Sequence, residues 1–211
     1  EFSSIQKSAD HYGLSLILGG AEVRLWDLVR NYRMLGLEIL GYHSNRSEYN
    51  EVYVDKAKRA TTAINTQFAP ASWLTLEALK VMDRPIEGAD WRSFSSSKTI
   101  AWKTGTSFGH KDAWAVGVTP DFVVGVWVGN ADGEGRPGLT GASTAAPVMF
   151  DIFAQLTGNK WFFAPEADLV DIQVCKQSGH KASAICPETE LIPALTKGEN
   201  TALCPYHILA Y

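Results

Sequence analysis

Three apolar stretches between residues 99 and 130 constrain the fold more than any other feature of the sequence. Residues 99–106, 112–118 and 122–130 are rich in β-branched and aromatic residues, and short polar segments separate them. The second separator contains Thr119-Pro120-Asp121, a composition typical of a hairpin turn. We therefore expect three consecutive antiparallel strands.

Helical spacing of apolar residues predicts helices around this sheet. In residues 22–37 and 71–82 the apolar side chains return every three or four positions, and Pro70 precedes the second segment. A third helix is expected over residues 145–157. Residues 41–67 are polar and lack a period, so we interpret them as a long surface insertion. The expected fold class is α+β, with an antiparallel sheet flanked by helices.

Charge and hydropathy exclude two classes of partner. The 211 residues carry a net charge of -4, and no cluster of Lys and Arg offers a phosphate-binding surface, so we expect no nucleic acid. The longest apolar run, residues 122–128, is interrupted by Gly125 and is too short to cross a bilayer. The chain has no initiator Met, so we expect it to be a piece of a longer protein.

All three cysteines lie near the carboxy terminus, which predicts a small separate extension over residues 165–211. Two of them could form a disulfide and leave one thiol spare. Alternatively, Cys175, Cys186 and Cys204 with His207 have the ligand types of a Cys3His zinc site. The spacing is irregular, so we favour a disulfide or buried thiols and assign neither a metal ligand nor a cofactor.

The segment Lys103-Thr104-Gly105-Thr106 carries the chemistry that we expect. On an extended strand residues two apart share a face, so Thr104 and Thr106 can present hydroxyl groups side by side to a carboxylate. Gly105 lets a ligand backbone approach closely, and the Lys103 ammonium supplies a positive field. The backbone N–H of Thr106 could serve as an oxyanion donor. We predict Lys103 and Thr106 as catalytic, and all four residues as substrate-binding.

Together with this motif, several other segments resemble those of the class A penicillin-binding proteins. The cysteine-containing tail most resembles the 1C type. Residues 1–164 then correspond to the carboxy-terminal part of a transpeptidase domain, without two strands and the serine-bearing helix. The matching segments are residues 12–23, 112–117, 124–129, Gly138-Leu139-Thr140-Gly141 and Ala145-Ala146-Pro147.

The resemblance implies a bifunctional peptidoglycan glycosyltransferase and D,D-transpeptidase as the parent. Its partners would be the stem peptide ending in D-Ala-D-Ala, β-lactams and cell-wall assembly proteins. The parent would lie in the periplasm, attached to the inner membrane only through an anchor outside this chain. The alternative is a noncatalytic ligand- or partner-binding module. Because a half-domain exposes apolar surface, we also expect marginal stability or self-association.

The family's nucleophile is the serine of a Ser-x-x-Lys motif, and this chain has strings of that form at Ser4 to Lys7 and at Ser95 to Lys98. Neither has the expected position. Ser95 is too close to Lys103 in sequence, and Ser4 comes directly before a segment that follows both earlier motifs in the family. No Ser-x-Asn sequence occurs. We therefore expect the chain to lack the nucleophile and to be inactive alone.

The remaining candidates have simpler interpretations. The histidines lack acidic partners at a general-base spacing, so we expect surface positions for them, with His110 in a turn or at the rim of the cleft. The tryptophans of the three strands are expected to pack the sheet against a helix. These residues are His11, His43, His110, His180, Trp102, Trp114 and Trp127.

Overall fold

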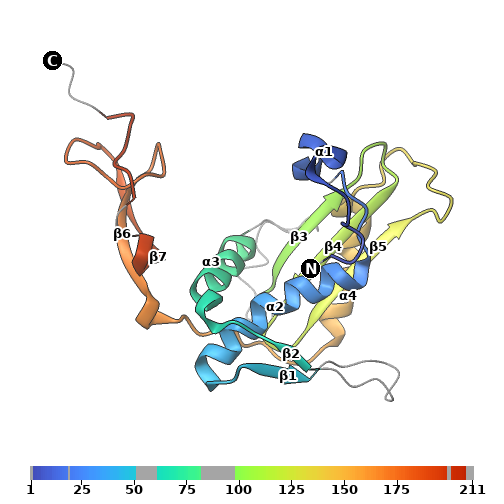
Figure 1. Cartoon of the computed structure of the whole chain (residues 1–211), viewed down its shortest axis with the longest axis horizontal. Coiled ribbons are helices and arrows are strands. Elements are labelled where there is room, and N and C mark those ends of the chain that lie inside the picture. The colour runs from blue at the N-terminus through green and yellow to red at the C-terminus, as the bar shows by residue number, and fades with distance from the viewer. Residues whose placement is uncertain (1, 19, 51–60, 82–97, 199–200, 208–211) are drawn as a thin grey trace.

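The computed structural model describes residues 2–18, 20–50, 61–81, 98–198 and 201–207. Helices are interspersed with groups of two or three consecutive strands, and the carboxy-terminal hairpin projects from the side of the molecule where α3 lies (Figure 1). The elements are α1 (Ala9–Tyr12), a 3-10 helix (Gly13–Leu18), α2 (Leu25–Ser44), β1 (Glu48–Asn50), β2 (Thr61–Ala63), α3 (Ala69–Lys80), β3 (Ala101–Thr106), β4 (Asp112–Val118), β5 (Val123–Gly129), α4 (Ala146–Gln155), β6 (Leu169–Cys175) and β7 (Thr189–Leu195).

The central sheet has the order β3-β4-β5, and all its pairs are antiparallel. This confirms the three strands expected from the sequence. The turn between β4 and β5 is closed by a hydrogen bond of 2.9 Å from the Thr119 N–H to the Phe122 carbonyl. The Thr119 hydroxyl also accepts the Phe122 N–H at 3.0 Å, a side-chain turn bond that Thr and Ser favour.

Helix α4 covers one face of the sheet. Met149 and Phe153 are at most 1% exposed, and Trp102 of β3 meets Phe150 in an edge-to-face contact. Gly117 is required beneath the helix, because a Cβ atom there would lie 2.5 Å from the Phe153 ring. The helix begins after a π-helical turn (Gly141–Ala145), with a proline in its first turn as the sequence predicts.

Helices α2 and α3 cover the opposite face. Ile39 of α2, Leu76 of α3 and Val118 of β4 are completely buried in one cluster with Phe162. Both faces of the described sheet therefore have helical cover, while Trp26, Phe68 and Phe108 are at least 50% exposed, so the expected marginal stability stays a prediction. Helix α3 lies within two residues of its predicted position.

Helix α2 extends to Ser44, well beyond the predicted end at residue 37. Gly36 and Gly41 lie inside the helix, where other side chains pack closely against its backbone. A Cβ atom would lie 3.2 Å from Phe162 at Gly36 and 2.2 Å from Ile64 at Gly41. The helix instead ends at Asn45, which has the left-handed conformation (φ 53°) common after a helix.

The interpretation of residues 41–67 as a surface insertion is wrong in two parts. The first residues of this range complete α2, and Ile64 is buried at 9% exposure. Strands β1 and β2 form a short antiparallel hairpin, while residues 51–60 lie outside the described residues. The polar composition fits the hairpin, whose outward residues are exposed.

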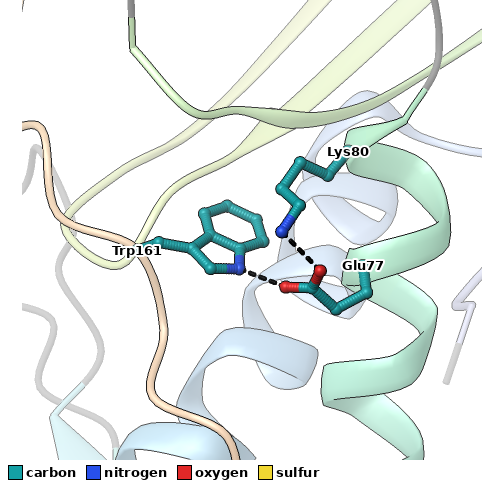
Figure 2. A network of polar contacts seen from close by, with 3 residues as sticks. All are labelled: Glu77, Lys80 and Trp161. Carbon is teal, nitrogen blue, oxygen red and sulfur yellow. Dashed lines mark hydrogen bonds and ion pairs between the residues drawn. The ribbon is translucent and has the colours of Figure 1, made fainter. Parts of the chain in front are cut away.

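A polar network ties the segment before β6 to α3 (Figure 2). The Trp161 indole N–H donates to one oxygen of Glu77, and Lys80 forms an ion pair with the other oxygen. The Lys80 ammonium also lies 5.1 Å from the centre of the Trp161 ring, within cation–π range. The chain is thus fixed against α3 before it leaves for the hairpin.

Strands β6 and β7 pair antiparallel from Leu169↔Leu195 to Cys175↔Thr189. Leu191 is 70% and Leu203 is 60% exposed, so this region buries few large side chains. The domain boundary at residue 165 stays a prediction. Among the described residues, no helix has the length and apolar character needed to span a membrane.

Candidate functional site

A cleft of about 860 Å³ lies beside β3. All four residues of the predicted motif line it, together with the amino-terminal segment, the start of α2 and the β3–β4 turn. Its lining residues are Phe2, Ile5, Leu16, Gly20, Ala21, Glu22, Val23, Leu28, Tyr32, Lys103, Thr104, Gly105, Thr106, Ser107, Phe108, Lys111, Asp112, Trp114 and Val116.

The register of β3 against β4 decides which backbone groups of the motif are available. The Ser107 N–H donates to the Asp112 carbonyl at 2.9 Å. Hydrogen-bonded and non-hydrogen-bonded pairs alternate in an antiparallel ladder, so Thr104 and Thr106 direct their N–H and C=O groups away from β4. No strand among the described residues pairs with this second edge of β3.

The side chains of the motif differ in their surroundings. Lys103 is exposed, and its ammonium donates to the Thr104 carbonyl at 2.6 Å, which places the positive charge at the free edge of β3. The Thr106 hydroxyl accepts the Gly141 N–H at 3.0 Å. Because this bond occupies a lone pair and not the hydroxyl proton, Thr106 can still donate to a ligand oxygen.

Gly105 lies opposite Trp114 in the ladder. A Cβ atom at Gly105 would meet only ordinary contacts with the Trp114 side chain, the nearest at 3.6 Å. The glycine is therefore not required by the packing of the strands. Its missing side chain instead leaves room above the sheet next to the cleft.

Trp102 packs the sheet against α4 as predicted, whereas for Trp114 and Trp127 packing against a helix stays a prediction. Trp114 lines the cleft and Trp127 is 37% exposed, with their ring centres 6.3 Å apart. The Trp127 indole N–H donates to Asp112 at 2.9 Å. Of these two side chains, only Trp114 lines the cleft.

The amino-terminal wall is fixed to α2 through Asp27. This carboxylate accepts hydrogen bonds from the Ser3 hydroxyl and the Ser3 N–H, and both bonds lower its pKa. On the same wall, burial raises the pKa of the Tyr32 phenol, so its hydroxyl stays protonated near neutral pH. Residues 12–23 of this wall belong to the segments that the sequence matched to the family, but the bonds between Ser3 and Asp27 were not predicted.

The first Ser-x-x-Lys string does not form a nucleophile and base pair. The Ser4 hydroxyl donates to the Glu22 carbonyl at 2.6 Å, and the Lys7 ammonium lies 3.2 Å from His11. The serine and the lysine thus have separate partners.

Only the lysine of the second Ser-x-x-Lys string belongs to the described residues. Ser95 lies outside them, while the Lys98 ammonium donates to the carbonyls of Phe153 and Leu156 at the end of α4. Sequence reasoning missed a third string, Ser178-Gly179-His180-Lys181. The Ser178 hydroxyl contacts Cys204, away from β3.

His110 occupies a turn position just past the motif. It has φ 54°, and its Nδ1 lies 3.1 Å from the Leu139 carbonyl. It is not among the residues that line the cleft.

A second group of chemically capable side chains lies in the carboxy-terminal hairpin region. One ligand atom from each of Cys175, Cys186, Cys204 and His207 lies within 4.8 Å of the others. None of the three cysteines forms a disulfide, and Cys175 and Cys204 are buried. The residues that the sequence offered as one alternative are thus brought together.

The pKa values in this group reflect its hydrogen bonds. Burial acts to raise the pKa of Cys204, but hydrogen bonds from Ser178 and from the backbone of His207 and Tyr206 outweigh it and lower the pKa to about 5. Burial and hydrogen bonds oppose each other at Cys175 in the same way, and its pKa is lowered. The Cys204 thiolate in turn raises the pKa of His207.

Comparison with solved structures identifies the fold. A crystal structure of penicillin-binding protein 1A from Haemophilus influenzae superposes with a TM-score of 0.56 over 88% of this chain and 34% of that chain, at 19% identity. The mixed helices and antiparallel sheet therefore form part of a penicillin-binding, transpeptidase-like fold. No protein-family model matches the chain.

Sequence comparison finds relatives among the penicillin-binding proteins. Penicillin-binding protein 1C of Escherichia coli is 29% identical over 137 residues, which is 64% of this chain and 16% of that protein. Penicillin-binding protein 1B of Vibrio cholerae is 36% identical over 101 residues, 48% of this chain and 12% of its own length. Penicillin-binding protein 1A of Aquifex aeolicus is 28% identical over 166 residues, which is 74% of this chain and 22% of that protein.

The chain is thus a homologue of the class A penicillin-binding proteins, the family that its motif and neighbouring segments indicated. It spans less than a quarter of the length of each of these three relatives.

Proposed function

We propose that the chain contributes the substrate-binding strand of a peptidoglycan D,D-transpeptidase. Its ligands would be a stem peptide that ends in D-Ala-D-Ala and the β-lactams that resemble it. The observation that carries this proposal is the edge of β3 opposite β4, which no strand among the described residues covers and where Lys103 and Thr106 border the cleft. The parent would be a bifunctional glycosyltransferase and transpeptidase of the 1C type, held at the inner membrane with this part in the periplasm.

The free edge suits an extended peptide. A peptide added beside β3 would bond the outward N–H and C=O groups of Thr104 and Thr106, as in other cases of strand addition. Its terminal carboxylate would accept a hydrogen bond from the Thr106 hydroxyl and face the Lys103 charge. The Thr106 N–H would stabilise the oxyanion of the reacting carbonyl. The apolar lining and Trp114 would contact the alanine methyl groups.

The nucleophilic serine would have to come from outside this chain. Among the described residues, Ser4 and Ser178 bond to groups other than a lysine, and Lys98 is engaged at the end of α4. Acyl transfer needs a serine and its base within hydrogen-bond reach of each other. The chain alone would therefore bind ligand without forming an acyl-enzyme.

The same observation supports a second candidate function, a noncatalytic module that binds ligands or cell-wall assembly proteins. Such a module needs the free edge and the cleft but no serine. The two candidates differ in what lies upstream in the native gene product. A Ser-x-x-Lys followed by a Ser-x-Asn supports the enzyme, and their absence supports the module.

Amide NMR of the ¹⁵N-labelled chain during titration with an acetylated peptide ending in D-Ala-D-Ala tests the binding proposal. We expect saturable shifts at Thr104, Gly105 and Thr106, and no equivalent shifts with the L-Ala-L-Ala peptide. Shifts confined to the β6–β7 hairpin, or equal responses to both peptides, would contradict the assignment of this cleft.

A further inference from the structure

The cluster of Cys175, Cys186, Cys204 and His207 has no part in the function proposed above. It lies in the hairpin region of β6 and β7, which stands away from the sheet and its cleft (Figure 1). Soft, deprotonatable ligands that converge in a region with little apolar core are typical of a structural metal site.

Backbone hydrogen bonds set the positions of these ligands and explain their irregular spacing. Cys175 ends β6, and its carbonyl accepts the N–H of Gly179, which has φ 70° and turns the chain back. The Cys175 N–H then donates to the His180 carbonyl at 2.8 Å. The Cys204 N–H donates to the Lys181 carbonyl, also at 2.8 Å. These backbone hydrogen bonds hold Cys175 and Cys204 close together independently of any metal.

The distances fit tetrahedral coordination. The Nδ1 atom of His207 lies 3.5 Å from the Cys175 sulfur and 3.3 Å from the Cys204 sulfur. With bonds of about 2.3 Å to sulfur and about 2.0 Å to nitrogen, a tetrahedral zinc ion separates S and N by about 3.5 Å. All four ligand atoms lie within 4.8 Å of one another, close enough to share one ion.

Neighbouring serines contact two of the ligand sulfurs and help to fix their positions. The N–H of Ser183 lies 3.3 Å from the Cys186 sulfur, and the Ser183 hydroxyl lies at the same distance. The Ser178 hydroxyl donates to the Cys204 sulfur at 3.2 Å. Hydrogen bonds of this kind orient the ligands of a metal and tune their charge.

We infer that Cys175, Cys186, Cys204 and the Nδ1 atom of His207 bind one Zn²⁺ ion in a closed Cys3His site that holds the hairpin region together. Binding releases the thiol protons to solvent and changes no oxidation state. Four protein ligands leave no open position, which makes the role structural. A disulfide would use only two of the three sulfurs and leave the third beside His207.

The test is elemental analysis of the full chain, purified without a metal-affinity tag and dialysed against metal-free buffer. We expect about one zinc ion per chain and an intact mass with all cysteines reduced once the metal is removed. Cys186→Ser and His207→Ala should lose the stoichiometric zinc. His180→Ala is the matched control, because it removes an exposed histidine of the same region from outside the ligand set, and it should retain the ion.

Cobalt exchange tests the geometry in the unaltered chain, so that misfolding of a variant does not decide the result. We expect the intense visible bands of tetrahedral cobalt with thiolate ligands. Octahedral cobalt, stoichiometric iron, a disulfide detected as a mass loss of two hydrogens, or three free thiols without metal would each overturn the proposal. Equal zinc loss in His180→Ala and His207→Ala would also overturn it.

Discussion

The sheet with its three helices and the β6–β7 region are stabilised by different kinds of side chain. In the first, Ile39, Leu76 and Phe153 are at most 1% exposed. In the second, Leu191 and Leu203 are mostly exposed, while Cys175 and Cys204 are buried. A buried large apolar side chain stabilises a fold by about 1.5–3 kcal/mol, so burial contributes more to the sheet than to the hairpin, where Ile172 and Val174 are buried. On the zinc proposal, the cysteine and histidine cluster supplies the remaining stability of the hairpin.

The two regions should therefore respond to different perturbations. The cleft is lined by the sheet, the amino-terminal segment, the start of α2 and the β3–β4 turn, and by no residue of the β6–β7 hairpin. Loss of the cluster should leave ligand binding unchanged, and a cavity in the core of the sheet should leave metal binding unchanged.

Chelation should give the largest difference between the regions. Zinc bound to small domains contributes about 10–16 kcal/mol of apparent binding free energy, more than a small hairpin can replace. With excess chelator we expect the amides of β6 and β7 to lose hydrogen-exchange protection while those of β4 keep it. Hydrogen exchange followed by mass spectrometry measures both in one sample. Unchanged protection in β6 would contradict the dependence on metal.

The substitution Phe153→Ala should destabilise the sheet by about 3–5 kcal/mol, because it removes a buried ring from beneath α4. Urea unfolding followed by tryptophan fluorescence measures the loss. Phe163→Ala is the matched control, since Phe163 is 77% exposed and its removal should change the free energy by less than about 0.5 kcal/mol. Equal losses in the two variants would refute the assignment of this core.

The substitution Gly117→Ala should cost about 1–3 kcal/mol, because the new methyl group would overlap Phe153 and Met149. Gly105→Ala provides the comparison within the same sheet, since its methyl group meets only ordinary contacts. Thermal melts of both variants should separate them clearly. A melting temperature lowered as much by Gly105→Ala as by Gly117→Ala would show that the cleft side of β3 is packed, not open.

The smallest effect should follow from Lys103→Ala. Lys103 is exposed, so stability should be unchanged, while affinity for the D-Ala-D-Ala peptide should fall about tenfold through the loss of one charge-assisted hydrogen bond. Lys197→Ala removes the same charge from the hairpin region and should leave affinity unaltered. The NMR titration described above measures both. Unaltered affinity in Lys103→Ala would remove this side chain from the proposed site.

The sheet could be predicted from the sequence because stretches rich in β-branched and aromatic residues are separated by short turn segments from β3 to β5. It mispredicted the end of α2, because Gly36 and Gly41 are helix-weakening by type but are needed where Phe162 and Ile64 approach the helix. Such contacts between distant residues cannot be read from local spacing.

The motif was found from sequence, but two of its properties were not. The outward direction of the Thr106 N–H follows from the register with β4, and the bond from Gly141 to the Thr106 hydroxyl joins segments 35 positions apart. Sequence spacing also could not decide among a disulfide, free thiols and a metal site. Cys204 lies near Cys175 because Lys181 forms β-bridges with both Val174 and Leu203, and these pairings cannot be inferred from spacing.

The central claim is that this chain holds a transpeptidase ligand but supplies no nucleophile. Intact mass spectrometry after incubation with excess benzylpenicillin tests it most directly, with Ser4→Ala and Ser95→Ala chains measured in parallel. We expect no covalent adduct on any of the three. A stoichiometric adduct on the unaltered chain that disappears in one of the variants would contradict it and would identify that serine as the nucleophile.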